Sequence, residues 1–110
     1  MKMPLVHDKE DPKCNLLDLI FIDIDSRETR QKLSRNGIKP ANTAVNAIKI
    51  RVISMFYRIN IKYVVNEINK KEELRNNFKF NSTLDYNQLS EIFSRFDELQ
   101  ILEFTLKTIK

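Results

Sequence analysis

Residues 38–60 read "IKPANTAVNAIKIRVISMFYRIN" and carry the clearest structural pattern in the chain. Apolar residues recur at steps of three and four, which places them on one side of a helix: Val45, Ile48, Val52, Met55, Phe56 and Ile59. Three basic residues lie off this stripe: Lys49, Arg51 and Arg58. The pattern predicts one amphipathic helix that buries its apolar side, with Asn42 or Thr43 suited to cap its start.

The preceding segment also favours a helix. Residues 15–36 contain no proline or glycine, and Gly37, the only glycine of the chain, follows where a helix end is expected. We therefore predict a helix that is kinked or divided near Ser26. The alternation of Ile20, Ile22 and Ile24 with other residues leaves a strand as the alternative.

Shorter helices are expected downstream. Asn60 can cap a helix that turns four apolar residues inward, namely Ile61, Val64, Val65 and Ile68, and Lys62, Asn66 and Asn69 outward. The stretch "KKEELRNNF" (70–78) adds another turn or two. A helix from about Asp85 buries Leu89, Ile92, Phe93 and Phe96, and a last one carries Leu99, Leu102, Leu106 and Ile109. Because sheets use glycine in turns and bulges, a single glycine also favours an all-α fold: a compact bundle of about five to six helices.

Length and composition indicate one globular domain. The chain has 110 residues, of which 42% are apolar and 31% charged, and a chain of this size can bury a core without disulfides or metals. Residues 1–13 contain Pro4 and Pro12 but no apolar periodicity. We therefore predict a mobile N-terminal tail at 1–13, with His7 solvated and without a partner, and a helical domain at 14–110.

The residues needed for the common catalytic sites are missing. The chain has one glycine, one cysteine and one histidine (Gly37, Cys14 and His7), so a glycine-rich phosphate loop, a Cys/His set and a Ser/His/Asp set are excluded. Asp23 and Asp25 could be considered as a metal pair, but on a helix they point about 200° apart, and no further oxygen ligands lie nearby. We expect no catalytic residue, no metal and no cofactor in this chain.

Two features of the chain indicate its compartment. The first residues lack the apolar core of a signal peptide, and no apolar run approaches the roughly 20 residues of a membrane span. A single cysteine suits a reducing environment. We predict a cytoplasmic protein that does not engage a membrane.

Charge is distributed unevenly along the chain. Residues 1–28 have a net charge of −3, residues 29–80 have 12 basic and 3 acidic residues, net +9, and residues 81–110 have −2. A basic block between acidic ends is typical of a surface that faces a polyanion. The alternative is an ordinary solvated, lysine-rich surface.

Residues 85–96, "DYNQLSEIFSRF", combine an apolar face with polar residues suited to reading DNA. Asn or Gln can pair with adenine, Arg with guanine, and Glu can accept a hydrogen bond from cytosine in the major groove. The same residue types are also common on any helix surface. The segment is therefore either a recognition helix or one more amphipathic helix that closes a small core.

Three motifs occur in order over about residues 41–106: "NIKYVVNEI" (60–68), "ELRNNFKF" (73–80) and "DYNQLSEIFSRF" (85–96). Together they resemble the N-terminal domain of insertion-sequence DDE transposases, especially archaeal versions. The resemblance implies a helix-turn-helix-like domain that binds the ends of a mobile element during transposition, a form of DNA recombination. It makes Asn60–Asn69 the supporting helix and Asp85–Phe96 the recognition helix.

The chain departs from that family in two ways. About fifteen residues separate the two helices, whereas a compact helix-turn-helix has a turn of three or four. The chain also ends at Lys110, before the carboxylates of a DDE catalytic domain would occur. We therefore expect a DNA-binding domain without the catalytic domain, and no enzyme activity in this chain, although the full-length family is a DNA transposase.

The leading prediction is recognition of double-stranded mobile-element DNA. Base contacts are expected from four residues of the 85–96 helix: Asn87, Gln88, Glu91 and Arg95. Phosphate contacts are expected from seven residues of the basic block: Lys49, Arg51, Arg58, Lys62, Lys70, Lys71 and Arg75. The alternatives are a helical protein-interaction module, whose last helix packs on a second copy or on the missing catalytic domain, and an inactive transposase remnant.

Overall fold

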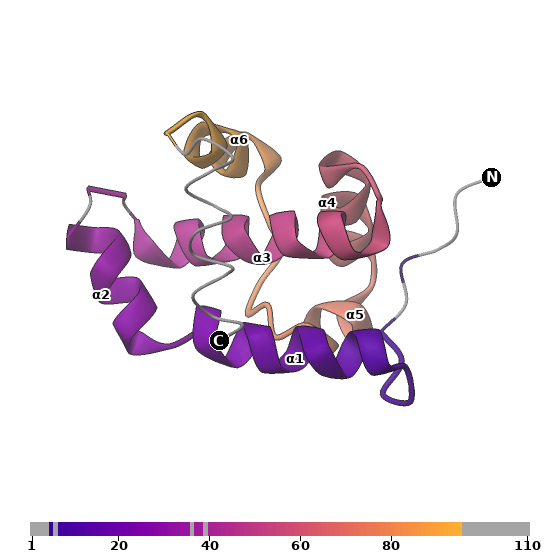
Figure 1. Ribbon diagram of the computed structural model, residues 1–110. Coiled ribbons are helices and arrows are strands. Elements are labelled where there is room, and N and C mark those ends of the chain that lie inside the picture. Colours follow the sequence, from indigo (N-terminus) through magenta and orange to yellow (C-terminus); the bar gives the residue numbers. More distant parts are fainter. Residues whose placement is uncertain (1–4, 6, 36, 39, 96–110) are drawn as a thin grey trace.

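The computed structural model describes residues 5, 7–35, 37–38 and 40–95, which form six α-helices and no strand (Figure 1). The helices are α1 (Pro12–Ile24), α2 (Arg27–Arg35), α3 (Ala41–Tyr57), α4 (Ile61–Lys70), α5 (Glu72–Asn77) and α6 (Tyr86–Arg95). The predicted all-α bundle of about five to six helices is confirmed. The predicted final helix, which carries Leu99 to Ile109, lies outside the described residues, as does Phe96.

Helix α3 is the centre of the fold. Helices α1, α2, α4 and α6 all pack against it (Figure 1), so it is buried on more than one side. Ile50 and Ile53, which lie off the predicted stripe, are fully buried, whereas Met55, which lies on the stripe, is 44% exposed. The prediction of a single buried side is wrong because a helix with four neighbours has little free surface. No helix in the described part combines the length and apolar character needed to cross a membrane.

Helix ends explain how the fold manages with one glycine. After α2, Gly37 has φ +76°, and the next N–H, of Ile38, donates to the Leu33 carbonyl over 3.0 Å, as in a Schellman motif. Arg58 after α3 and Lys79 after α5 occupy the same left-handed conformation, with φ of 54° and 62°. Two helix ends therefore use a basic residue where glycine would be free of strain.

The predicted division near Ser26 is confirmed. Helix α1 ends at Ile24 and α2 begins at Arg27, and the Ser26 hydroxyl accepts a hydrogen bond from the Thr29 N–H at 3.2 Å. The Thr29 hydroxyl in turn donates to the Asp23 carbonyl at 2.8 Å. This local hydrogen bonding ends one helix and starts the next, and the strand alternative is excluded for this segment.

Two of the described residues before α1, Leu5 and His7, pack against the core. Leu5 is 1% exposed, and the His7 side chain is 2% exposed with Nε2 2.9 Å from Asp18 Oδ1. The His7 ring also meets Phe78 edge to face, with centroids 4.9 Å apart. The prediction that His7 is solvated and unpartnered is therefore wrong. Helical periodicity cannot reveal an extended segment whose few side chains fill gaps between helices.

The predicted N-terminal cap is confirmed for α4 and wrong for α3. The Asn60 side chain accepts a hydrogen bond from the Lys62 N–H at 2.8 Å, which caps α4 as expected. Helix α3 instead starts after Pro40, which has no side chain able to accept, so neither Asn42 nor Thr43 is its cap. Proline replaces a capping bond by restricting the backbone at the point where the helix begins.

Candidate nucleic-acid interface

Helix α6 has one buried and one exposed side. Leu89 and Ile92 are 2% and 3% exposed, and the helix packs mainly against α3. The other side, called here the outer face of α6, is exposed and is formed by Asn87, Gln88, Ser90, Glu91 and Ser94. Three of the four predicted base-contact residues thus lie on one accessible face, while the side chain of Arg95 lies outside the described part.

Two side chains fix where α6 begins. Asp85 Oδ1 accepts hydrogen bonds from the Asn87 N–H at 2.8 Å and the Gln88 N–H at 3.4 Å. Asn69 of α4 holds the preceding loop, because its Nδ2 donates to the Leu84 carbonyl at 2.8 Å and its Oδ1 accepts from the Leu84 N–H at 2.7 Å. The prediction that Asn69 faces solvent is wrong. The Asn69 amide satisfies the backbone N–H and carbonyl of Leu84, which lies fifteen residues further along the chain. Helical spacing around Asn69 cannot reveal a partner at that distance.

The support of α6 differs from the helix-turn-helix expectation. The resemblance makes residues 60–69 the supporting helix, yet α6 packs mainly on α3, and α4 packs on α3 and α5. Helix α5 occupies part of the connection that separates α4 from α6. The segment between the two helices is therefore a structured link, and α3 is the platform on which α6 lies.

One predicted phosphate-contact residue lies directly beside α6. Lys62, in the first turn of α4, is exposed, and its Nζ is 5.9 Å from the centre of the Tyr86 ring at the start of α6. Arg58 and Lys70 are also exposed. Lys71 is exposed but lies 3.3 Å from Glu67 Oε1 of α4. Lys62 is thus the described cation that the geometry associates most directly with the outer face of α6.

Two other predicted phosphate contacts are partly buried. Arg75 Nη1 donates to the carbonyl groups of Ile68 and Asn69 at 3.1 and 2.7 Å, so it satisfies backbone acceptors at the end of α4. Arg51 is half-buried and is engaged within the protein. Both have structural neighbours that compete with an external phosphate.

Lys49 is not available for DNA. Its side chain is fully buried, with Nζ 3.1 Å from Asp25 Oδ2 and 2.9 Å from the Lys79 carbonyl, to which it donates. The rings of Phe21 and Phe80 flank Nζ, with centroids 5.0 and 4.4 Å away. The prediction of a phosphate contact by Lys49 is wrong because Lys49 is buried. Helical spacing does not reveal the carboxylate just after α1 and the carbonyl in the α5–α6 loop that hold it. Lys49 and the four residues around its amino group, Asp25, Lys79, Phe21 and Phe80, are called here the Lys49 corner.

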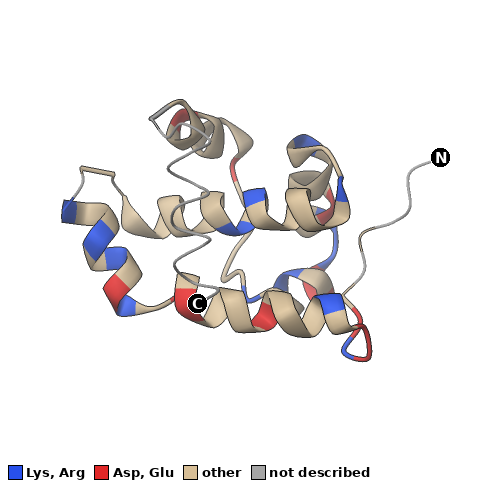
Figure 2. Ribbon diagram, viewed as in Figure 1, with Lys and Arg blue, Asp and Glu red and all other residues tan. Residues whose placement is uncertain are grey.

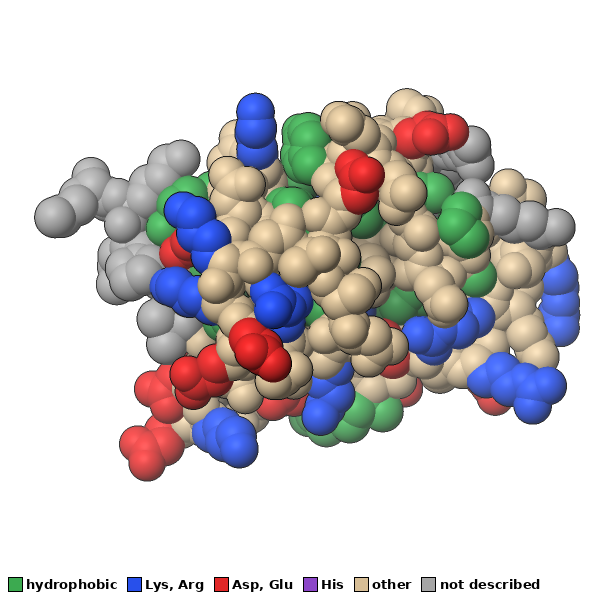
Figure 3. Space-filling model, turned by 180° about the vertical axis from the view of Figure 1, so that it is seen from behind, with side chains coloured by type: hydrophobic (Ala, Val, Ile, Leu, Met, Phe, Trp, Pro, Cys, Tyr) green, Lys and Arg blue, Asp and Glu red, His purple; other side chains and the backbone are tan. Residues whose placement is uncertain are grey.

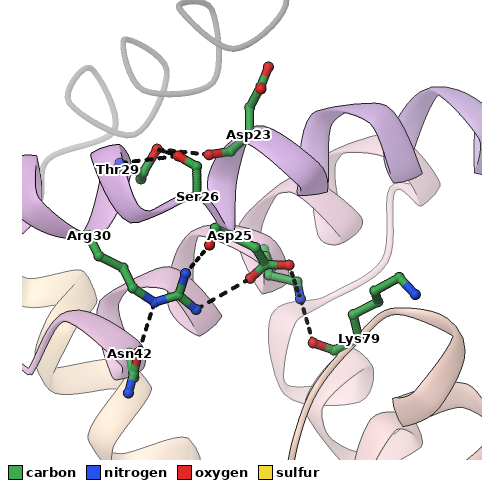
Figure 4. Close-up of polar contacts among 8 residues, drawn as sticks. Asp23, Asp25, Ser26, Thr29, Arg30, Asn42 and Lys79 are labelled. Atoms are coloured by element: carbon green, nitrogen blue, oxygen red, sulfur yellow. Dashed lines mark hydrogen bonds and ion pairs between the residues drawn. The ribbon is translucent and has the colours of Figure 1, made fainter.

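The Lys49 corner also fixes α2. Arg30 Nε donates to Asn42 Oδ1 at 2.9 Å, its Nη1 donates to the Asp25 carbonyl, and its Nη2 is 3.8 Å from Asp25 Oδ1 (Figure 4). Burial lowers the pKa of Lys49, and the nearby Asp25 carboxylate opposes that shift. Figure 4 shows Asp23 directed away from Asp25, whose carboxylate already faces two cations. Among the described residues, no three His, Cys, Asp or Glu side chains are grouped so as to hold a metal.

Surface charge is mixed. Basic residues occur on α2 to α5, but α4 and α5 also carry three glutamates, and α6, which begins just after Asp85, carries Glu91 (Figure 2). On the face seen in Figure 3, basic and acidic side chains are interspersed. The net charge of the 29–80 segment is thus not gathered in one continuous patch there. On that face, the cations that can attract a polyanion occur in smaller groups.

One such group was missing from the sequence prediction. Arg27, Arg30, Gln31, Ser34 and Arg35, called here the α2 arginine face, line a shallow open depression on α2. The signal was present as "RETRQKLSR" (27–35), with four basic residues and one acidic residue at helical spacing. The sequence prediction did not include it because the motifs that directed the choice of phosphate contacts lie within about residues 41–106, downstream of α2.

The outer face of α6 and the α2 arginine face present amide, hydroxyl, carboxylate and guanidinium groups at the surface. These groups suit binding through hydrogen bonds and charge. Lys49, in contrast, is fully buried and stabilises the interior. No protein-family model, curated protein or solved structure matches the chain.

Proposed function

We propose that this chain binds double-stranded DNA, with α6 in the major groove and Lys62 on the adjacent backbone. The observation that carries the proposal is the outer face of α6. It is exposed along its described length, while the opposite side is anchored on α3 and Lys62 lies beside its first turn. A ten-residue helix is about 15 Å long, and the major groove, about 12 Å wide, admits one helix.

The order of residues along α6 suits base reading. Asn87 and Gln88 are the second and third residues of the helix, and recognition helices contact base edges with their N-terminal residues. Glu91 follows one turn later and disfavours contact with phosphate, while it can accept from cytosine. The outer face of α6 thus supplies discrimination between sequences, and neighbouring cations supply affinity.

The motifs at 60–68, 73–80 and 85–96 extend the proposal to its biological target. By their resemblance to the N-terminal domain of insertion-sequence transposases, the preferred DNA is the end of a mobile element. In this role the chain binds and does not cut: catalysis belongs to a DDE domain that residues 1–110 do not supply. A duplex selected from a random pool by the wild-type protein provides the test sequence, so the sequence of the element itself is not needed.

The first experiment measures duplex binding by fluorescence anisotropy at 50 to 200 mM salt. The logarithm of the binding constant should fall linearly with the logarithm of salt concentration, with a slope of about −0.9 for each phosphate contacted. Lys62→Ala should weaken binding to every duplex and make the slope shallower by about 1. The matched control is Lys13→Ala, since Lys13 is exposed on α1, on the other side of α3 from α6 (Figure 1). A slope near zero, or no binding at 50 mM salt, would rule out the proposal.

The second experiment separates discrimination from attraction. Gln88→Ala and Asn87→Ala should reduce the preference for the selected duplex over random DNA by about 1–3 kcal/mol each. Ser90→Ala, on the same exposed face but with a shorter side chain, is the control. Equal weakening on selected and random DNA would contradict base reading by α6.

A protein-interaction module is the second candidate, favoured by the outer side of α1. Leu16, Leu19 and Ile22 are 45, 64 and 64% exposed at a spacing of three. The face is symmetric about Leu19, since Asn15 and Asp23 lie four residues to either side and both are exposed. Two copies packed antiparallel would place each Asn15 amide near the partner's Asp23 carboxylate, so the occupant we propose is a second copy.

Light scattering at increasing protein concentration tests this pairing. A dimer that Leu19→Asp converts to a monomer without loss of helical content would support it. A wild-type monomer at all concentrations would exclude it. Duplex binding by Leu19→Asp then shows whether DNA binding requires the dimer.

A further inference from the structure

We propose that the α2 arginine face is a phosphate-binding site, which holds the backbone of the nucleic acid whose bases face α6. The inference rests on the proposed DNA binding for its ligand. It adds Arg27, Arg30 and Arg35, none of which belongs to the phosphate contacts predicted from the sequence. It starts from a depression whose lining contains three guanidinium groups, one amide and one hydroxyl, and no carboxylate.

Helical spacing brings these residues to one side. Arg27, Gln31, Ser34 and Arg35 are separated by four, three and one residues, so they share one face of α2. Arg27 and Arg35 are about 12 Å apart along the helix axis. One strand of B-DNA carries about three to four phosphates over the same length. The α2 arginine face is thus long enough to contact several phosphates of one DNA strand, and it is longer than a single small anion requires.

The three arginines of the α2 arginine face differ in their interactions with the rest of the protein. Arg30 bonds to Asn42 and the Asp25 carbonyl, and its Nη2 lies 3.8 Å from Asp25 Oδ1, so its guanidinium is fixed and partly neutralised. Arg27 and Arg35 are exposed, and neither has a carboxylate partner among the described residues. Two accessible guanidinium groups therefore flank one that is already oriented. Arginine is the preferred side chain for phosphate because its planar donors match two oxygens at once.

The position of α2 relates this face to α6. Both α2 and α6 pack on α3, and Figure 1 shows α2 at the start of α3, α4 at its end, and α6 above it. Lys62, on α4, lies beside the start of α6, and α2 lies towards the opposite end of α3. A helix in the major groove has a phosphate strand on each side. Cations towards the two ends of α3 would therefore extend the contact with the DNA backbone beyond α6.

The test compares an Arg27→Gln/Arg35→Gln double variant with Lys32→Gln, which removes a charge from the same helix at a residue outside the depression. The double variant should bind every duplex more weakly. Its salt slope should be shallower by about 0.9 for each phosphate that it no longer binds, and its preference for the selected duplex should stay unchanged. Lys32→Gln should change the slope by less than half as much. Thermal unfolding of all variants checks that the fold is retained, which matters most for Lys32→Gln, since Lys32 is half-buried and engaged within the protein whereas Arg27 and Arg35 are exposed.

Other outcomes separate the two proposals. If Lys62→Ala weakens binding but the double variant does not, the α2 site is wrong and the proposed function stands. If Lys32→Gln is as damaging as the double variant, general charge attraction replaces a defined site. If the wild-type protein binds no duplex, the proposed function fails, and titration with inorganic phosphate followed by amide NMR decides the α2 site. Shifts confined to Arg27, Ser34 and Arg35 support the site, whereas no shifts overturn it.

Discussion

Lys49 and Lys62 lie thirteen residues apart in the basic segment, yet they occupy opposite environments. Lys49 is fully buried between Asp25, the Lys79 carbonyl and two aromatic rings, whereas Lys62 is exposed beside α6. Both count equally in a net charge of +9 for residues 29–80. The comparison shows that a charge count along the sequence combines cations that hold the fold together with cations that can attract a partner.

The largest expected effect comes from breaking the Lys49 corner. Asp25→Ala leaves a buried lysine without its carboxylate, which should reduce the free energy of unfolding by about 3–5 kcal/mol in urea titrations. Lys62→Ala, by contrast, should change it by less than about 0.5 kcal/mol. If the two variants lost similar stability, the distinction between the two lysines would be wrong.

A double variant sharpens this result. Asp25→Leu/Lys49→Met replaces the ion pair with apolar side chains, and such a replacement is often neutral or stabilising by about 1–4 kcal/mol. The double variant should therefore be more stable than Asp25→Ala. Because the outer face of α6 is unchanged, its DNA affinity should match that of the wild type. A large loss of affinity would show that the Lys49 corner acts on binding as well as on stability.

The next effect concerns Asn69, which connects the interior to α6. Asn69→Ala leaves the Leu84 N–H and carbonyl without their partner and should cost about 1–3 kcal/mol. Hydrogen exchange should accelerate first in α6, since the loop that positions it is released. Asn66→Ala on the same helix is the control, because Asn66 is exposed. Uniform acceleration over all helices would argue against a local role.

A smaller effect should appear in the dependence of stability on pH. Burial lowers the pKa of Lys49 below its usual 10.5, so between the two values the unfolded chain binds the proton more tightly than the folded protein. The free energy of unfolding, measured relative to Lys49→Met, should therefore rise as pH rises through that window. Asp25 opposes the shift, which keeps the effect modest. A relative stability that falls with pH would mean that the ion pair outweighs burial.

Local features of the fold followed from the sequence, and distant contacts did not. The helix division at Ser26, the Asn60 cap and the inward apolar side of α6 depend on residues within about one or two turns, where spacing is informative. The burial of Lys49 and Asn69 depends on partners 15 to 30 residues away. For the candidate interface, exposure of Asn87, Gln88 and Glu91 agreed with the pattern, while the α2 arginine face required knowing which side of α2 is free.

The left-handed backbone at Lys79 has a consequence for engineering. A non-glycine residue in this conformation costs roughly 1–2 kcal/mol, and the carbonyl of Lys79 itself accepts the hydrogen bond from Lys49. Lys79→Gly should relieve the backbone while retaining that carbonyl, and the melting temperature should rise by several degrees, roughly 4–8 °C per kcal/mol for a domain of this size. The protein could thus be made more robust at one exposed residue, with α6 and its neighbours left untouched.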